Sequence, residues 1–246
     1  MAYSFWTLAG VFIFGLLIGS FLNVVIHRTP RGENIAWPGS HCPKCGESLR
    51  WYHNIPLLSW IALGGKCAFC KAPISARYPL IELLTALLWV VLYLKIGPVW
   101  YFPFIAASFT ALLALSAIDF EYFAVPDSVN LFALAAALVR PDFLVAARDA
   151  ALAAGGLWLL AWLISKAAKK EAMGGADVIV AGTMAALLGL PGFFVALFVA
   201  ALLAIVPSLL AKDTMVPFVP FLSMGTLIVY LFETPIMKAL EHYVYG

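Results

Sequence analysis

Charged side chains are scarce in this chain. They make up 11% of its 246 residues, whereas about 25% is usual for a soluble domain, and 64% of the residues are hydrophobic. A water-soluble chain of this size has too much surface to cover with so few charges, whereas a bilayer requires apolar runs of about 20 residues. The composition therefore excludes an ordinary soluble protein and predicts a polytopic membrane protein.

Two further absences narrow the class of protein. The 15 Lys and Arg exceed the 13 Asp and Glu by only two and are scattered along the chain, which argues against nucleic acid as a partner. The sequence also contains no Gly-x-Gly, and so it lacks the Rossmann-type fingerprint of many cofactor-binding proteins.

Long apolar runs, in contrast, are abundant, and they predict an all-α polytopic membrane protein with about eight transmembrane helices. The first run has no charged residue before it and no small-residue cleavage site after it, so we expect a retained helix rather than a signal peptide. The fourth run is short and predicts either a tilted or irregular helix shielded by its neighbours or a helix whose ends extend into less apolar sequence. The runs lie at residues 3–26, 79–96, 99–118, 128–139, 144–165, 177–190, 192–210 and 218–237.

The basic residues predict the orientation of these helices. If the N-terminus lies outside, the loops on the cytoplasmic side contain eleven of the 15 Lys and Arg, as the positive-inside rule requires. Both termini then lie outside, because the number of spans is even. The eleven residues are Arg28, Arg31, Lys44, Arg50, Lys66, Lys71, Arg77, Lys166, Lys169, Lys170 and Lys212.

One polar segment interrupts the apolar pattern. Residues 27–78 are rich in Pro, Gly, Cys and charge and form the one small cytoplasmic loop domain that we expect. It separates a first transmembrane helix at residues 1–26 from a transmembrane bundle at residues 79–246. Apolar residues between Trp51 and Ile61 form either the core of this loop or its seat on the membrane, with a substrate groove as an alternative.

All four cysteines lie in this loop, as two Cys-x-x-Cys pairs. Two residues inside each pair let both thiolates point at one ion, and four thiolates complete a closed tetrahedral zinc site. Two disulfides or free thiols are the alternative, but disulfides are disfavoured in the cytoplasm, where thiols stay reduced. His41 adjoins the first pair and is a possible substitute ligand. The predicted ligands of a structural zinc ion are Cys42, Cys45, Cys67 and Cys70.

Two carboxylates lie at the ends of apolar runs, where a charged group is unfavourable unless it has a function. An acid near the bilayer centre costs about 2.5 to 3.5 kcal/mol, so acids in or beside the spans are functional candidates. Asp119 ends the third apolar run and Asp177 opens the sixth, at the same membrane boundary. If they meet, their repulsion favours a single shared proton, which is the state that aspartic proteolysis requires.

Structural roles remain open for both acids. Asp177 is a good N-cap for the helix that follows it, and Asp119 can be a boundary residue satisfied by solvent. In that case the chain is a non-enzymatic, zinc-dependent membrane scaffold or transporter.

The sequence resembles the bacterial prepilin peptidases, also called type IV leader peptidases, over nearly its whole length. Each motif alone is weak, but their order along the chain makes the resemblance specific. Besides the cysteine pairs, the matching segments are residues 19–25 with Arg28 and Pro30, residues 54–60, residues 74–82, Asp119 with residues 125–127, residues 174–177, and residues 216–222.

The resemblance implies a membrane aspartic endopeptidase with Asp119 and Asp177 as the catalytic pair and the four cysteines as zinc ligands. Its implied partners are prepilins or related pseudopilins, whose basic leader is cleaved on the cytoplasmic side of the bacterial inner membrane, besides the membrane lipid itself. It also implies methylation of the new N-terminus with S-adenosylmethionine as cofactor. One departure is Ala176, which stands where the family element has glycine and would be strained if the position required positive φ.

Overall fold

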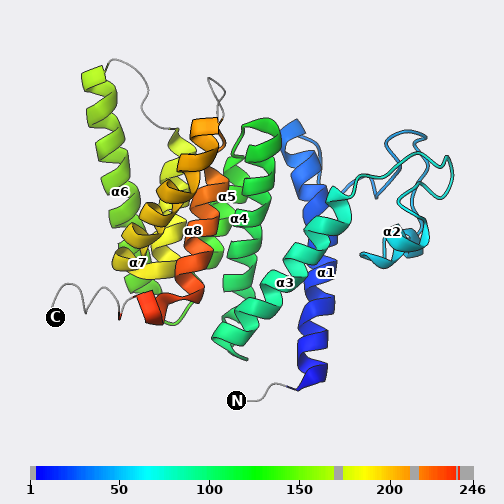
Figure 1. The fold of residues 1–246 in the computed structure, drawn as a ribbon, viewed down its shortest axis with the longest axis horizontal. Helices are drawn as coiled ribbons and strands as arrows, with labels where there is room; N and C mark the ends of the chain where they lie inside the picture. Colours follow the sequence, from blue (N-terminus) through cyan, green and yellow to red (C-terminus); the bar gives the residue numbers. More distant parts are fainter. Residues whose placement is uncertain (1–3, 169–173, 211–215, 237, 239–246) are drawn as a thin grey trace. The chain divides into compact units, whose positions relative to one another are not determined.

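The computed structural model describes residues 4–168, 174–210, 216–236 and 238, and it confirms the all-α class. These residues form helices, loops and two isolated β-bridges, with no extended strand among them. The chain divides into two compact units, unit 1 at Met1–Pro98 and unit 2 at Val99–Gly246, which we describe separately. The helices are α1 (Phe5–Arg28), α2 (Leu58–Ala62), α3 (Arg77–Ile96), α4 (Phe102–Tyr122), α5 (Asp127–Leu138), α6 (Phe143–Ala168), α7 (Gly175–Leu210) and α8 (Val219–Leu231), with 3-10 turns η1 (Thr29–Arg31) and η2 (Trp51–His53) (Figure 1).

In the part of the chain that the structure describes, the eight apolar runs correspond to seven helices, five long and two shorter. Within the described residues, α1, α3, α4, α6 and α7 are long and apolar enough to cross a membrane, whereas α5 and α8 are shorter apolar helices. Two of the predicted runs lie in α7, which is interrupted at Gly189, where φ is 70° and ψ is 169°. Residues 3 and 237, at the outer ends of the first and last predicted runs, lie outside the described residues.

In unit 1, α1 packs along α3 through a small-residue face on α1. Gly15 and Gly19 sit one turn apart on this face, and an added Cβ would come within 2.7 Å of the Cα atom of Ala86 or Glu82. Real Cβ atoms do not approach backbone so closely, so these positions accept only glycine. The Gly-x-x-x-Gly spacing therefore sets the close contact of the two helices, as small-residue motifs do in membranes.

Side chains from the two helices hold the loop domain of unit 1. Asn23 of α1 donates from Nδ2 to the carbonyl oxygen of Tyr78 at 3.0 Å. Glu82 of α3 accepts a 2.8 Å hydrogen bond from the backbone N–H of Leu57, a residue in the unusual positive-φ region. Trp51 and Leu58 expose large apolar surfaces and so do not form a loop core. The loop is therefore positioned by polar contacts to the helices and by the turns that contain its two Cys-x-x-Cys pairs.

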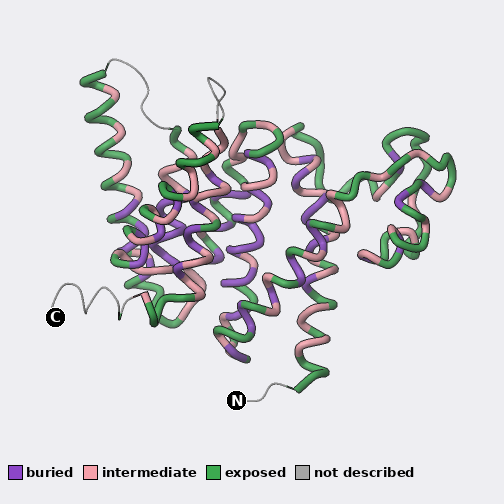
Figure 2. The backbone as a smooth tube through the Cα atoms, viewed as in Figure 1, coloured by how far each residue is buried: buried purple, intermediate pink, exposed green. Residues whose placement is uncertain are grey.

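Unit 2 is a bundle in which α4, α5, α7 and α8 surround most of the buried residues, drawn purple in Figure 2. The C-terminal half of α6, in contrast, exposes apolar side chains such as Trp158 and Leu163. Helices α7 and α8 approach closely at Gly225, where a Cβ would come within 2.6 Å of the carbonyl oxygen of Ala196. Small residues thus permit close helix packing in this unit as well.

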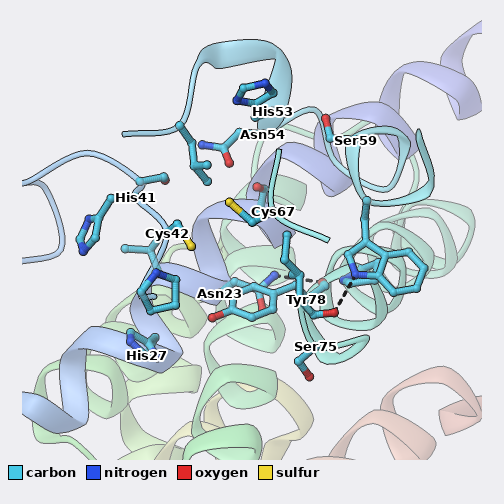
Figure 3. A pocket seen from close by; sticks show the side chains of 18 of the residues that line it. Asn23, His27, His41, Cys42, His53, Asn54, Ser59, Cys67, Ser75 and Tyr78 are labelled. Carbon is cyan, nitrogen blue, oxygen red and sulfur yellow. Dashed lines mark hydrogen bonds between the residues drawn. The ribbon is translucent and has the colours of Figure 1, made fainter. Parts of the chain in front are cut away.

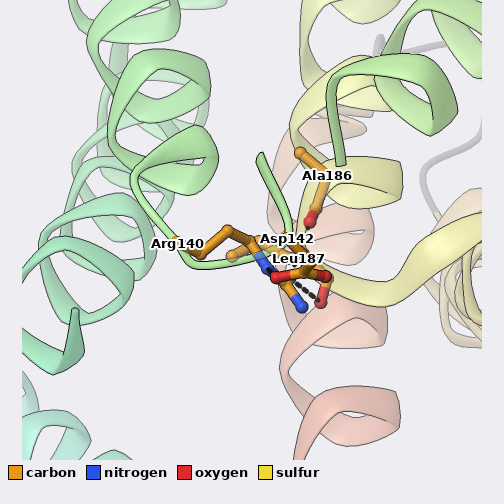
Figure 4. Close-up of polar contacts among 4 residues, drawn as sticks. All are labelled: Arg140, Asp142, Ala186 and Leu187. Carbon is orange, nitrogen blue, oxygen red and sulfur yellow. Dashed lines mark hydrogen bonds and ion pairs between the residues drawn. The ribbon is translucent and has the colours of Figure 1, made fainter. Parts of the chain in front are cut away.

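The interruption of α7 exposes carbonyl groups that Arg140 satisfies. A helix end leaves its last carbonyl oxygens without partners in the helix. Nη1 of Arg140 donates to the carbonyl of Ala186 at 2.9 Å and to that of Leu187 at 3.4 Å, while Nε donates to the carboxylate of Asp142 (Figure 4). Partial burial would raise the pKa of the Asp142 carboxyl, but the hydrogen bond and charge of Arg140 outweigh it and hold the pKa below its ordinary value.

Candidate acid-pair site and cysteine cluster

The first predicted acid, Asp119, lies near the C-terminal end of α4 and is 7% exposed. Its Oδ2 atom accepts a hydrogen bond of 3.1 Å from the backbone N–H of Val219, and Phe218 supplies a second backbone N–H. Val219 is the first residue of α8. The carboxylate is therefore held by the N-terminus of a helix, where unpaired N–H groups and the helix dipole stabilise negative charge.

The second predicted acid, Asp177, lies in the first turn of α7 and is half-buried. The helix begins at Gly175, so Asp177 is a residue of the first turn and is not the N-cap. Its carboxylate accepts a hydrogen bond from the backbone N–H of Gly174. The local fold thus satisfies one of its oxygens and leaves the group accessible to a neighbour.

The structure places the two acids within range of each other's charge. They are 58 positions apart in sequence, yet the charge of Asp119 acts on the carboxyl group of Asp177. Two carboxylates within range of each other's charge repel, and a single proton shared between them relieves the repulsion. One acid can then take a proton while the other donates one, which is the chemistry of a general acid–base pair.

Asn130 connects α5 to the acid pair, and sequence reasoning did not single it out. Its side chain is fully buried, and Nδ2 donates 2.9 Å to the carbonyl oxygen of Ala176, the residue before Asp177. Its Oδ1 atom is buried without a hydrogen-bond partner among the described residues. The sequence does contain a signal for Asn130: it is an amide inside a short apolar run, and a buried polar group in a membrane helix is unfavourable unless it has a role.

Ala176 is not strained by its position in the Gly-Gly-Ala-Asp element. It is helical within α7, and the described non-glycine residues with positive φ are Leu57, Lys71 and Phe123. An alanine therefore fits where the family element has glycine.

The four cysteines converge in unit 1 without disulfide bonds. All four sulfur atoms lie within 4.8 Å of one another, and the Sγ atoms of Cys42 and Cys70 are 3.9 Å apart. Sulfurs at about 2.3 Å from a tetrahedral zinc ion would be separated by about 3.8 Å, so the cluster has the size of such a site. The described residues thus form a cluster that can hold a metal ion.

Two matching backbone knuckles build this cluster. The N–H of Cys42 bonds to the carbonyl of Glu47 at 2.9 Å, and the N–H of Cys67 bonds to that of Ala72 at 2.8 Å. The residue after each pair has positive φ: Gly46 at 72° and Lys71 at 59°. The first knuckle therefore has a glycine at this position, whereas the second accepts a lysine in the same conformation.

Backbone N–H groups of the first knuckle stabilise the thiolate form of Cys42. The N–H groups of Cys45 and Lys44 lower the pKa of the Cys42 thiol to about 6. For Cys45, the N–H of Glu47 acts in the same direction, but desolvation and the neighbouring sulfurs raise the pKa to about 11. The cluster therefore does not carry four thiolates at neutral pH by itself, and a bound dication would supply the missing stabilisation.

The fold and the acid pair define the class: a polytopic helical membrane protein with paired carboxylates at helix ends and a separate cysteine cluster. Residues 13–96 match the bacterial peptidase A24 N-terminal domain, and residues 106–209 match the type IV leader peptidase family. The two matches fall in unit 1 and unit 2, respectively. No solved structure matches the chain significantly.

Curated relatives indicate the same family, and each relative given below is named a prepilin leader peptidase/N-methyltransferase. The Pseudomonas aeruginosa protein is 38% identical over 194 residues, or 67% of each chain, and the Burkholderia pseudomallei protein is 33% identical over 93% of this chain and 86% of the relative. The Myxococcus xanthus protein is 39% identical over 72% of this chain, which spans only 55% of that relative. The chain belongs to the type IV leader peptidase family.

Proposed function

We propose that this protein is a membrane aspartic endopeptidase that removes the basic leader from type IV prepilins or related pseudopilins and then N-methylates the new N-terminus. The relatives named prepilin leader peptidase/N-methyltransferase support both activities. The observation that carries the proposal is the placement of Asp119 at the N-terminus of α8 and of Asp177 in the first turn of α7, within range of each other's charge. The alternative of a non-enzymatic, zinc-dependent scaffold or transporter is not favoured, because the relatives are named as enzymes.

In the proposed reaction, Asp119 and Asp177 share one proton. The ionised acid takes a proton from a water molecule, which attacks the carbonyl carbon of the scissile peptide bond, while the protonated acid polarises the carbonyl oxygen. A proton then passes to the leaving nitrogen as the carbon–nitrogen bond breaks. The backbone N–H groups of Phe218 and Val219 hold Asp119 in place during these steps.

We infer that Cys42, Cys45, Cys67 and Cys70 hold a structural zinc ion. Four protein ligands leave no open coordination position, so the ion orders the loop and does not activate water. Because cysteine ligands bind as thiolates, metal binding would stabilise the folded loop directly.

The proposed orientation places the loop and the acid pair on the cytoplasmic side of the bacterial inner membrane. The distribution of basic residues supports it, although Lys169, Lys170 and Lys212 lie outside the described residues. The exposed apolar side of α6 suits contact with membrane lipid. Acids at the membrane boundary can reach a peptide bond that lies just outside the membrane helix of the substrate.

The test is leader removal from a co-expressed prepilin by Asp119→Asn and Asp177→Asn variants. Each change keeps the size of the side chain and removes its acid–base function, so each single variant should leave the prepilin unprocessed. Asp142→Asn is the matched control, because it makes the same chemical change outside the acid pair and should retain cleavage. Full processing by either acid-pair variant, with membrane insertion verified, would refute the proposal.

A further inference from the structure

The loop domain of unit 1 has an inner side that faces α1 and α3. A cavity of about 440 Å³ lies on this side, and its lining includes Asn23 of α1, Glu82 of α3, and His53 and Ser59 of the loop (Figure 3). None of the lining residues belongs to the exposed face of α2. The outer side of the loop is therefore a separate surface.

Helix α2 presents apolar side chains on this outer side. Leu58 and Ile61 are three positions apart and so lie on one face of the helix, where they are 66% and 67% exposed. Ser59 is buried instead, and its hydroxyl donates a 2.7 Å hydrogen bond to the carbonyl oxygen of Tyr52. A helix on the surface of a soluble domain has the opposite arrangement, with its apolar stripe facing the core. The exposed face of α2 therefore suits an apolar or amphipathic partner.

The turn η2, which packs against α2, adds aromatic rings. Trp51 is 79% exposed, and its ring meets the ring of Tyr52 edge-on, with centroids 5.6 Å apart. The row continues through His53 to Phe69, at centroid distances of 4.4 Å and 5.3 Å. Exposed apolar side chains that gather in this way mark an interaction site. We call this site the outer loop surface, and it consists of Trp51, Tyr52, Leu58, Ile61 and Phe69.

The loop that carries this surface is basic. Residues 27–78 contain seven Lys and Arg and two acids. Nη1 of Arg50 donates a 2.8 Å hydrogen bond to the hydroxyl of Tyr52, and the guanidinium lies 6.0 Å from the centre of that ring. Lys66 and Lys71 are exposed and lie close to the surface in sequence. These charges favour an anionic partner and oppose a basic one, such as the leader of the proposed substrate.

A membrane provides a partner that is both anionic and apolar. Helices α1 and α3 are each long and apolar enough to cross a membrane, and the loop joins the end of α1 to the start of α3. The loop is thus tethered at both ends beside the membrane surface. Trp and Tyr side chains prefer the headgroup region of a bilayer, and Lys and Arg are attracted to anionic headgroups there.

We propose that the outer loop surface lies on the headgroup region of the membrane, with its aromatic and aliphatic side chains inserted and with Arg50, Lys66 and Lys71 in contact with anionic phospholipid. This contact holds the loop against the membrane at a second place, in addition to its attachment to α1 and α3. It requires neither leader cleavage nor methylation, so its test is independent of the proposed function.

The first test is photo-crosslinking of purified full-length protein in nanodiscs of phosphatidylcholine mixed with phosphatidylglycerol, an anionic lipid. Leu58→p-benzoylphenylalanine places a photoreactive side chain on the outer loop surface. Glu47→p-benzoylphenylalanine is the matched control at an exposed loop position outside this surface. Lipid adducts at position 58 should exceed those of the control about tenfold, because an inserted side chain contacts lipid continuously. Equal adduct yields at the two positions would overturn the proposal.

Nanodiscs of phosphatidylcholine alone test the choice of lipid. Without anionic headgroups, the adduct yield at position 58 should fall about tenfold, because the basic residues lose their partners. An unchanged yield would refute contact with anionic lipid. Adducts of position 58 with an added prepilin, formed in place of lipid adducts, would assign the surface to the substrate and would also overturn the proposal.

Hydrogen exchange of the wild-type protein provides a test without any substitution. Backbone amides of residues 50–61 should exchange about threefold more slowly in nanodiscs that contain phosphatidylglycerol than in those that lack it. Amides of α4, which belongs to unit 2, are the internal control and should exchange equally in both. Equal exchange of residues 50–61 in the two kinds of nanodisc would contradict the proposal.

Discussion

The two units assemble their candidate sites by different physical means. In unit 1 the four sulfurs come from two short knuckles whose spacing is local, and few large apolar side chains are buried in the loop. In unit 2 the two acids are 58 positions apart and are held by backbone N–H groups at the N-terminal ends of α7 and α8. The loop should therefore depend on its metal, and the acid pair on helix packing.

This difference predicts that substitutions in the two units have different consequences. Loss of a metal ligand should disorder the loop and leave the unit 2 bundle intact, because a closed metal site contributes its binding energy to local folding. Loss of a buried hydrogen bond in unit 2 should instead shift the position of Asp119 or Asp177. The following four predictions test this contrast, from the largest expected effect to the smallest.

The largest effect is expected at the acid pair. Asp119→Asn or Asp177→Asn should each lower the rate of leader cleavage by about 10² to 10⁴, the usual contribution of general acid–base catalysis. Because the two acids act as one unit, the double variant should be little slower than either single variant. Cleavage rates of purified proteins on a prepilin substrate measure this, and multiplying effects in the double variant would contradict a shared-proton pair.

The next effect is expected at the cysteine cluster. Cys42→Ser should reduce the metal content from about one ion per chain to nearly none and make residues 27–76 sensitive to limited proteolysis. Elemental analysis and peptide mapping measure both changes. His41→Ala is the control, since the exposed His41 neighbours Cys42 and its ring contacts the carbonyl of Gly39. Metal loss in that control would make His41 a ligand, and wild-type protein purified without metal would refute the zinc site.

A smaller effect is expected at Asn130. Asn130→Ala removes the hydrogen bond to Ala176 and should lower the free energy of unfolding by about 1 to 3 kcal/mol. If this bond positions Asp177, the cleavage rate should fall and its pH profile should shift. Thr226→Ala is the matched control, because Thr226 is equally buried and, among the described residues, its hydroxyl bonds to the carbonyl of Leu222 in its own helix. Equal cleavage rates and pH profiles in the two variants would assign Asn130 a purely structural role.

The smallest effect is expected at Asp142. Since Arg140 holds the pKa of Asp142 below its ordinary value, the ion pair stabilises the folded state above pH of about 4, and this contribution is lost as the pH falls through the lowered pKa. Asp142 is partly exposed, so Asp142→Asn should cost about 1 kcal/mol or less at pH 7. Melting temperatures from pH 7 to pH 3 should converge for wild type and variant, and a constant difference would contradict the pairing.

Local sequence patterns predicted the features that depend on local geometry. The apolar runs predicted the helices, and the two cysteine pairs predicted one cluster. Each follows from helical periodicity or from a spacing of a few residues. The two runs predicted at residues 177–190 and 192–210 both lie within α7, on either side of the break at Gly189.

The tertiary structure alone decided which distant groups meet. The amino-acid sequence determined that acids stand at two helix ends, but only the packing of α4, α5, α7 and α8 gives Asp119 the N–H groups of Phe218 and Val219 and gives Asn130 the carbonyl beside Asp177. Likewise, no spacing predicts the cavity around Asn23 and Glu82, because its lining comes from two helices and a folded loop. Periodicity and short motifs are local properties of a chain, whereas these contacts depend on helix packing over long sequence separations.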